Sequence, residues 1–399
     1  MRLPRLGSAL LALPLALGGT LGAPLPAHAA EGWGSEPVIS SAAHRQLCAD
    51  FLFVGVRGSG EPSGFGETVT DARNGLKKQW KRDGRVRQVW LDYPAVAPQT
   101  LADVPFESLM FDEPMPSTEY FDSAETGADR LVEVLQDSVK RCPRERVILA
   151  GFSQGAQVIT SALATVRPGD QLLAAILLGN PSHYPSQSVR EIDGTAPLEA
   201  IGMGAYFHVT RQVGAGEGNR QKAVEQMLQS TFDMHEGKTD KEHLRAAMKQ
   251  AGAEIPPEAY PMTYSVCLAG DMVCDSSKPM AEILVSATNL EREMNRTRPI
   301  HLSYKEQNTA GTIEAVAKVI NTTTLPEAPR KQHLPVRTTE YLPSRPDWVM
   351  TASVALGALV VGFLGGLWRG RALGRRSAMA AVRRRLEASS PETAEDGDD

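Results

Sequence analysis

Short apolar runs alternate with amphipathic stretches along much of the chain. The run Phe51–Val56 is apolar throughout and stops at a glycine-rich turn, which is typical of a buried strand. Apolar residues recur at helical spacing over 128–140, which predicts a helix. The same pattern gives strands at 51–56, 86–91, 146–150, 172–178 and 263–268, and helices at 68–80, 128–140, 156–166, 280–294 and 311–320. Such alternation predicts an α/β fold in which helices cover both faces of a parallel sheet.

Two segments depart from this alternation. Residues 94–120 are rich in proline and aromatic residues, and we expect a loop there. Residues 195–262 are rich in glycine and charge, with helical stretches predicted at 223–232 and 241–249. We interpret 195–262 as an insertion over the sheet, and our hypothesis is that it forms a lid or an acyl-binding wall.

The N-terminal segment 1–30 has the pattern of a secretory signal peptide. Arg2 and Arg5 precede an apolar run, Ala9–Leu17, and a small-residue cleavage signal follows at Ala27-His28-Ala29. We expect cleavage near Ala29 or Ala30. An uncleaved N-terminal anchor is the alternative.

A second hydrophobic segment, Trp348–Trp368, carries no charge and has tryptophan at each end. At about 1.5 Å per residue it spans about 30 Å, the thickness of a bilayer core. Four arginines follow between 369 and 376, so the positive-inside rule places the C-terminus in the cytoplasm. A buried soluble helix is the alternative. The predicted organisation is a signal peptide at 1–30, a domain at 45–324, a proline-rich linker at 325–347, a transmembrane helix at 348–368 and a cytoplasmic tail at 369–399.

Charge and cysteine content narrow the function classes. The net charge of -5 over 399 residues, without a clustered basic face, gives no reason to expect nucleic acid as a partner. All four cysteines lie in the part predicted to be exported, where two disulfides are favoured over free thiols. Cys267 and Cys274 are close enough to pair across a short loop, which leaves Cys48 with Cys142. The spacing suits neither a zinc site nor a redox Cys-x-x-Cys motif.

The strongest chemical signal is Gly151-Phe152-Ser153-Gln154-Gly155, which fits Gly-x-Ser-x-Gly. It follows a predicted strand and precedes a predicted helix, as the nucleophile elbow of an α/β-hydrolase does. In that turn the serine oxygen projects above the sheet near the positive end of the helix. The motif therefore predicts Ser153 as a catalytic nucleophile.

A serine nucleophile needs a base, and in α/β-hydrolases the chain order is serine, acid, histidine. Among the histidines after Ser153, His333 lies in the linker, and three others lie in the 195–262 segment. His183 leaves little chain for an acid and a strand before it. His301 is therefore the predicted base. The histidines placed in the 195–262 segment are His208, His235 and His243.

The acid is expected just after a strand and before His301. Asp271 follows the strand 263–268 and lies inside the loop closed by Cys267 and Cys274, and Asp275 is the alternative. The oxyanion needs two donors. We expect the backbone N–H of Gln154 as one and Ser59, in the turn after the first core strand, as the other.

The sequence resembles the cutinase family over roughly residues 45–320. The shared motifs are Arg-Gly-Ser at 57–59, Gly-Phe-Ser-Gln-Gly at 151–155, Gly-Asp-Met-Val-Cys at 270–274 and His-Leu-Ser-Tyr at 301–304, together with the four cysteines. The resemblance implies a compact three-layer α/β-hydrolase with the pairs Cys48–Cys142 and Cys267–Cys274. It also implies a triad of Ser153, Asp271 and His301 and an oxyanion hole from Ser59 and Gln154.

Composition and departures from the family refine this expectation. The arginine- and alanine-rich composition looks like that of actinobacterial members. Small fungal members lack the 195–262 segment and a membrane anchor, and they have a shorter interval between acid and histidine. A membrane-bound form is better suited to lipid esters of its own envelope than to cutin.

The predicted function is therefore a serine esterase that hydrolyses lipid or acyl esters of the cell envelope, with a hydrophobic ester as substrate. It needs no metal and no organic cofactor. A peptidase, phospholipase or thioesterase using the same triad is one alternative. A non-catalytic cell-envelope scaffold protein is another.

Overall fold

The computed structural model describes Trp33 and residues 38–43, 47–112, 116–166, 169–215, 219–256 and 262–326. The predicted signal peptide, transmembrane helix and cytoplasmic tail lie outside these residues, as does nearly all of the predicted linker. Within the described ranges, no helix has both the length and the apolar character to cross a bilayer.

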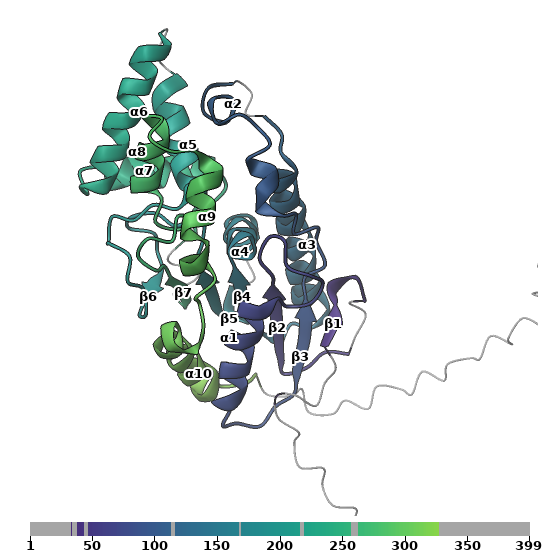
Figure 1. Ribbon diagram of the computed structural model, residues 1–399. Helices are drawn as coiled ribbons and strands as arrows, with labels where there is room; N and C mark the ends of the chain where they lie inside the picture. Colours follow the sequence, from purple (N-terminus) through teal and green to yellow (C-terminus); the bar gives the residue numbers. More distant parts are fainter. Residues whose placement is uncertain are drawn as a thin grey trace, which may run out of the picture. The chain divides into compact units, whose positions relative to one another are not determined.

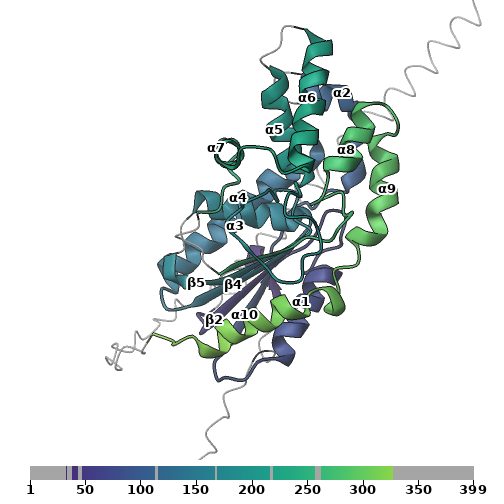
Figure 2. The ribbon, with the colours of Figure 1, turned by 90° about the vertical axis from the view of Figure 1, so that its left-hand side faces the viewer.

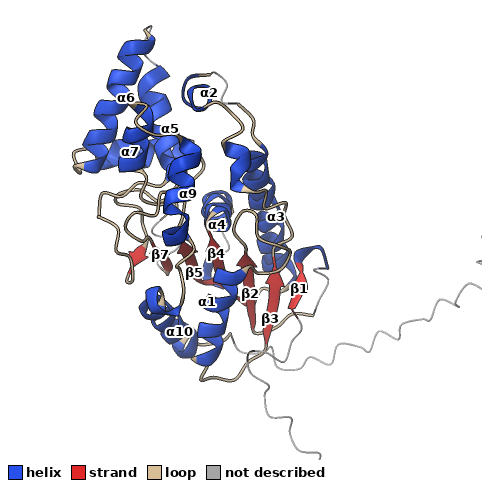
Figure 3. Cartoon of the chain, in the orientation of Figure 1, coloured by secondary structure: helices blue, strands red, loops and turns tan. Residues whose placement is uncertain are grey.

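A sheet of seven parallel strands forms the centre of the described chain, in the order β1-β3-β2-β4-β5-β7-β6. The strands are β1 (Val38–Ser40), β2 (Phe51–Val56), β3 (Val86–Trp90), β4 (Arg146–Phe152), β5 (Leu172–Leu178), β6 (Arg190–Glu191) and β7 (Thr263–Val266). Because all the strands are parallel, their carboxyl ends share one edge (Figure 3). Residues that follow these strands are therefore brought together at this edge.

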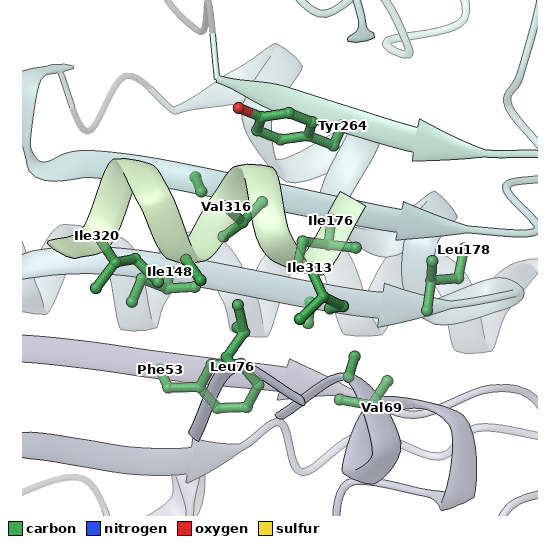
Figure 4. Packing of buried hydrophobic residues seen from close by; sticks show 14 of the residues in the cluster. Phe53, Val69, Leu76, Ile148, Ile176, Leu178, Tyr264, Ile313, Val316 and Ile320 are labelled. Atoms are coloured by element: carbon green, nitrogen blue, oxygen red, sulfur yellow. The ribbon is translucent and has the colours of Figure 1, made fainter. Parts of the chain in front are cut away.

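Helices cover both faces of the sheet, as the apolar strand pattern predicts (Figure 1). One face packs against α1 (Glu67–Lys78) and α10 (Ala310–Thr322), and the other against α3 (Glu119–Arg141) and α4 (Gln154–Thr165). Side chains alternate along β2, so that Phe53 joins the first core and Val54 the second. Figure 4 shows α10 placing Ile313, Val316 and Ile320 over the first face.

A third group of helices lies beyond the carboxyl edge (Figure 2). It consists of α2 (Phe106–Phe111), α5 (Met203–Ala215), α6 (Arg220–His235), α7 (Lys241–Gln250), α8 (Ser277–Leu284) and α9 (Leu290–His301). These helices have an apolar cluster of their own, which includes Leu109, Tyr206, Met227 and Leu244. The chain therefore builds a helical layer on the side of the sheet where parallel α/β folds place their sites.

One expectation about this layer was wrong. Residues 94–120 are not a loop throughout, because the 3₁₀ turn Pro98–Leu101 and α2 form there and α3 already begins at Glu119. Leu101, Leu109 and Met110 are buried in the helical cluster, so tertiary packing overrides the turn-rich composition. The segment 195–262 also contains α5 in addition to the two predicted helices.

The predicted helix 280–294 is two helices. Helix α8 ends at Leu284. Ser286 then adopts a φ of 57°, a left-handed conformation that cannot continue a helix. A new helix starts when the Asn289 side chain accepts a hydrogen bond from the backbone N–H of Arg292. The break lets α9 run in its own direction to His301. The short edge strands β1 and β6 were also not predicted, since two or three residues show no periodicity.

Both predicted disulfides are present, Cys48–Cys142 and Cys267–Cys274. Beside the first of them lies a buried ion pair between Arg87 and Glu145, with Nη2 2.6 Å from Oε2 and Nε 3.1 Å from Oε1. The Ser138 hydroxyl also donates to Glu145, at 2.9 Å. This cluster joins β3, α3 and the start of β4 at the end of the sheet away from the helical layer.

We predict that Glu145→Gln lowers the free energy of unfolding by about 3–5 kcal/mol, because the Arg87 guanidinium is left buried without a countercharge. The control is Asp137→Asn, which breaks the partly exposed Arg141–Asp137 pair and is expected to cost about 0.5 kcal/mol. Guanidinium denaturation without reductant measures both. Similar small losses in the two variants would contradict the prediction.

Candidate active site

Ser153 occupies a sharp turn between β4 and α4. Its backbone has φ 54° and ψ -123°, a strained conformation for a residue with a side chain. A Cβ at Gly155 would lie 2.1 Å from the carbonyl oxygen of Val56, and a Cβ at Gly151 would lie 2.5 Å from the carbonyl oxygen of Gly155. Only glycine fits at these two positions. The strand, turn and helix that the motif predicts are therefore observed.

Asp271 lies in the loop that follows β7, between Cys267 and Cys274, and is fully buried. Its carboxylate accepts hydrogen bonds from the backbone N–H of Val273 at 3.0 Å and from the Tyr304 hydroxyl at 2.6 Å. These donors compensate the cost of burying a charged group. The alternative acid, Asp275, instead accepts from the backbone N–H of Gly270 at 2.9 Å, and burial raises the pKa of its carboxyl.

His301 is the last residue of α9. Its Nδ1 lies 3.0 Å from Oδ1 and 2.9 Å from Oδ2 of Asp271, and its ring stacks on Phe152 with centroids 4.7 Å apart. A carboxylate only accepts hydrogen bonds, so Nδ1 carries a proton, and in the neutral imidazole Nε2 is the nitrogen with the free lone pair. The imidazole is thus fixed in the tautomer that a general base needs.

Two further residues complete this arrangement, and the sequence assigned neither a role. Tyr304 donates to Asp271 and accepts from the backbone N–H of Leu268 at 3.1 Å. Burial raises its pKa well above the ordinary value for tyrosine, so the hydroxyl stays protonated. Gly179, directly after β5, has φ 57°, and a Cβ there would lie 3.1 Å from both Asp271 Oδ2 and His301 Cε1. Tyr304 belongs to the His-Leu-Ser-Tyr motif, whereas only its place after a strand marks Gly179.

The two residues predicted for the oxyanion hole lie in rigid surroundings. The Gln154 side chain is fully buried and donates to the carbonyl oxygen of Tyr120 at 2.9 Å, so only its backbone N–H can serve. Ser59 lines the pocket described below. Its turn is held by Glu61, which accepts from the backbone N–H of Gly58 at 2.6 Å and from that of Glu67 at 2.8 Å.

A pocket of about 470 Å³ opens at the carboxyl edge and brings Ser59, Ser153 and His301 together. Its apolar lining comes from Ala97, Pro98, Ala102, Phe152, Met203, Met272, Val273, Met294 and Leu302. Among the described residues of the segment 195–262, Met203 lines the pocket. Helix α9 and residues 97–103 contribute more of the lining. Asp271 lies beneath His301 and does not reach the pocket. The pocket therefore combines an apolar interior with Ser153 and the exposed side of His301.

Within the described residues, no group of three or more histidine, cysteine, aspartate or glutamate side chains is arranged to hold a metal ion. Of the other histidines, His183 is 5 % exposed and its Nδ1 has no hydrogen-bond partner, although Glu191 Oε1 lies 3.5 Å away. Burial lowers the pKa of His183 to about 4. His183 is therefore a neutral core residue under ordinary conditions.

Known proteins resemble this chain in sequence and in fold. The cutinase family model matches residues 47–284, so the chain belongs to the cutinase family. It is similar to Carboxylesterase Culp1 of Mycobacterium tuberculosis, with 31 % identity over 37 % of this chain and 59 % of that protein. It is also similar to Cutinase 4 of Emericella nidulans, with 25 % identity over 37 % of this chain and 55 % of that protein. The chain spans less than two thirds of the length of these relatives.

Among solved structures, the catalytic core domain of acetyl xylan esterase from Trichoderma reesei matches with 16 % identity and a TM-score of 0.38. That match covers 68 % of this chain and 98 % of the other.

We predict that stability falls with acidification because of His183. The unfolded histidine titrates near 6.5 and the folded one near 4, so the unfolded chain binds more protons between these values. The free energy of unfolding should therefore drop by about 3 kcal/mol as the pH falls from about 6.5 to about 4. Denaturation across this range, compared with His183→Gln, measures the effect. An equally steep pH dependence in the variant would count against it.

Proposed function

We propose that the chain is a serine carboxylesterase that uses Ser153 as nucleophile, His301 as base and Asp271 as orienting acid. The observation that carries the proposal is the pair of contacts between His301 Nδ1 and the Asp271 carboxylate, at the floor of a pocket that also exposes Ser153. Because Nδ1 is engaged by Asp271, Nε2 is the ring nitrogen that remains for Ser153. Membership of the cutinase family and the likeness to Carboxylesterase Culp1 support ester hydrolysis as the reaction.

In this mechanism His301 Nε2 takes the proton of Ser153 Oγ while Oγ attacks the ester carbonyl carbon. The carbonyl oxygen becomes negative and is stabilised by the backbone N–H of Gln154 and by Ser59. Asp271 stabilises the imidazolium, which then protonates the leaving alcohol. Water attacks the resulting acyl-enzyme with help from the same histidine and releases the acid.

The substrate proposed is a lipid or acyl ester of the cell envelope. Methionine, proline and phenylalanine side chains in the pocket suit a hydrocarbon chain, and methionine adapts to irregular apolar shapes. The two disulfides suit an oxidising compartment outside the cytoplasm. We further propose that residues 1–30 direct export and that Trp348–Trp368 anchors the protein in the membrane.

We predict that Ser153→Ala lowers kcat for p-nitrophenyl ester hydrolysis by at least about 10⁴-fold, because the variant has no nucleophile. Ser161→Ala, two turns further along α4, is the matched control and should keep full turnover. The measurement is p-nitrophenol release by the purified full chain. Turnover that survives in Ser153→Ala would refute the assignment. A folded wild-type protein that neither turns over esters nor reacts with a serine-directed phosphonate would favour a non-catalytic scaffold.

We predict that Tyr304→Phe lowers kcat about tenfold with little change in KM, because it removes a charge-assisted hydrogen bond from Asp271 without touching the pocket lining. Tyr264→Phe is the control, since Tyr264 is equally buried and its hydroxyl contacts only Met262 Sδ among described groups. A matching kcat loss in both variants, or a loss confined to KM, would show that Tyr304 acts through packing alone.

A further inference from the structure

One wall of the pocket depends on the helical layer for its position. The pocket-lining residues of this wall are Ala97, Pro98, Gln99, Ala102 and Asp103. Leu101, in the middle of the same turn, is fully buried and belongs to the apolar cluster of the helical layer. One short turn therefore faces the pocket with several residues while Leu101 is fixed in the layer behind it.

Helix α2 continues this wall and depends on its neighbours. It has six residues, whereas isolated helices shorter than about 12–15 residues are marginal in water. Its buried residues Leu109 and Met110 join the apolar cluster that holds Leu101. Phe106 packs against Phe207 of α5, with ring centroids 6.2 Å apart. Residues 97–112, here called the wall segment, are thus held in place by tertiary contacts.

The most directional of these contacts comes from Arg211 of α5. Its side chain is buried, and its guanidinium donates to the backbone carbonyl oxygens of Leu109 at 2.5 Å and Asp112 at 2.6 Å. Both carbonyls lie at the C-terminal end of α2, where a helix leaves its last carbonyls without internal partners and where a positive charge is favoured. Arg211 therefore caps α2 from a neighbouring helix.

A second arginine contacts α2 from the outside. Arg220, at the start of α6, pairs with Glu107 at 2.6 Å, and its guanidinium lies 5.0 Å from the ring centroid of Phe111. Both charged side chains of this pair are exposed, so water and salt screen it. Arg211 is therefore the polar contact on which the position of the wall segment depends most.

The wall segment adjoins the oxyanion turn. The backbone N–H of Gly60 donates to the carbonyl oxygen of Ala95 at 2.7 Å, and a Cβ at Gly60 would lie 3.6 Å from Pro98 Cδ. In the proposed mechanism the leaving alcohol lies against His301, which protonates it, whereas the acyl carbonyl oxygen lies at Ser59. The wall segment is therefore next to the acyl part of a bound ester.

We propose that Arg211 is a positioning residue for acyl-chain specificity, which holds α2 to α5 and thereby fixes the width of the pocket along the acyl chain. Arg211 does not line the pocket, so it acts through the wall segment. This inference rests on the proposed esterase function. It gives α5, in the segment 195–262, the role of a support behind the acyl-binding wall.

The test uses Arg211→Met, which keeps a long side chain but removes the donors. The purified full chain is assayed with p-nitrophenyl butyrate and p-nitrophenyl octanoate. We expect the ratio of kcat/KM for the octanoate over the butyrate to fall about tenfold, mainly through a higher KM for the octanoate, because the longer chain reaches further along the wall. The kcat for the butyrate should stay within about twofold of the wild-type value.

Two further variants distinguish positioning from general damage. Arg211→Lys keeps the charge but not the two-pronged geometry of a guanidinium, so its ratio should lie between those of the wild type and Arg211→Met. Arg245→Met is the matched control, because Arg245 lies on α7 of the same layer and pairs with Glu242. Amide hydrogen exchange over 98–112 should become faster in Arg211→Met and stay unchanged in Arg245→Met.

The outcomes separate this inference from the esterase function. An unchanged ratio in folded Arg211→Met, or an equal fall in Arg245→Met, would overturn the role of Arg211 and leave the esterase function intact. An equal loss of kcat with both esters would show that Arg211 supports the fold alone, and would also overturn it. If the folded wild type hydrolyses neither ester, the esterase function fails, and the specificity role fails with it.

Discussion

The site depends on keeping a charged carboxylate where no water reaches it. Asp271 is fully buried, and burying a carboxylate without hydrogen-bond donors is costly. Its hydrogen-bond donors come from separate parts of the chain, namely Val273 in its own loop, His301 at the end of α9 and Tyr304 beyond it. Each donor has to be positioned independently, and most of the structure around the carboxyl edge serves that positioning.

The segment 190–196 fixes two of these parts at once. Its first two residues form β6 and pair with β7. Asp193 accepts hydrogen bonds from the backbone N–H groups of Gly311 at 3.1 Å and Thr312 at 2.6 Å, which caps the first turn of α10. Thr195 accepts through Oγ1 from Ala269 at 3.0 Å, inside the loop that carries Asp271. The loop that carries Asp271 and the start of α10 are therefore both hydrogen-bonded to one short segment. The charged and turn-forming composition of this segment did not predict that role.

Local signals made the fold and part of the site predictable. The apolar strands, the glycines flanking Ser153 and the spacing of the cysteines each reflect a requirement that acts within a few residues, and the cutinase resemblance they supported is confirmed by the family match. The roles of Tyr304 and Gly179 were beyond such reasoning, because they arise only when β5, β7 and α9 meet. The helices in 94–120 and the break before α9 were missed for the same reason. Burial of Leu109 and capping by Asn289 outweigh local composition there.

The packing of α10 on α1 has a consequence for how the protein is made. Ile313 and Ile320 share one apolar core with Val69 and Leu76, so the first and last helices of the domain close the same face of the sheet. Before residue 320 has been synthesised, α10 is missing from this face, and the core that contains Phe53, Ile148 and Ile176 is incomplete. Contacts so distant in sequence form late and slowly. The domain therefore completes this core only after nearly all of it has been synthesised.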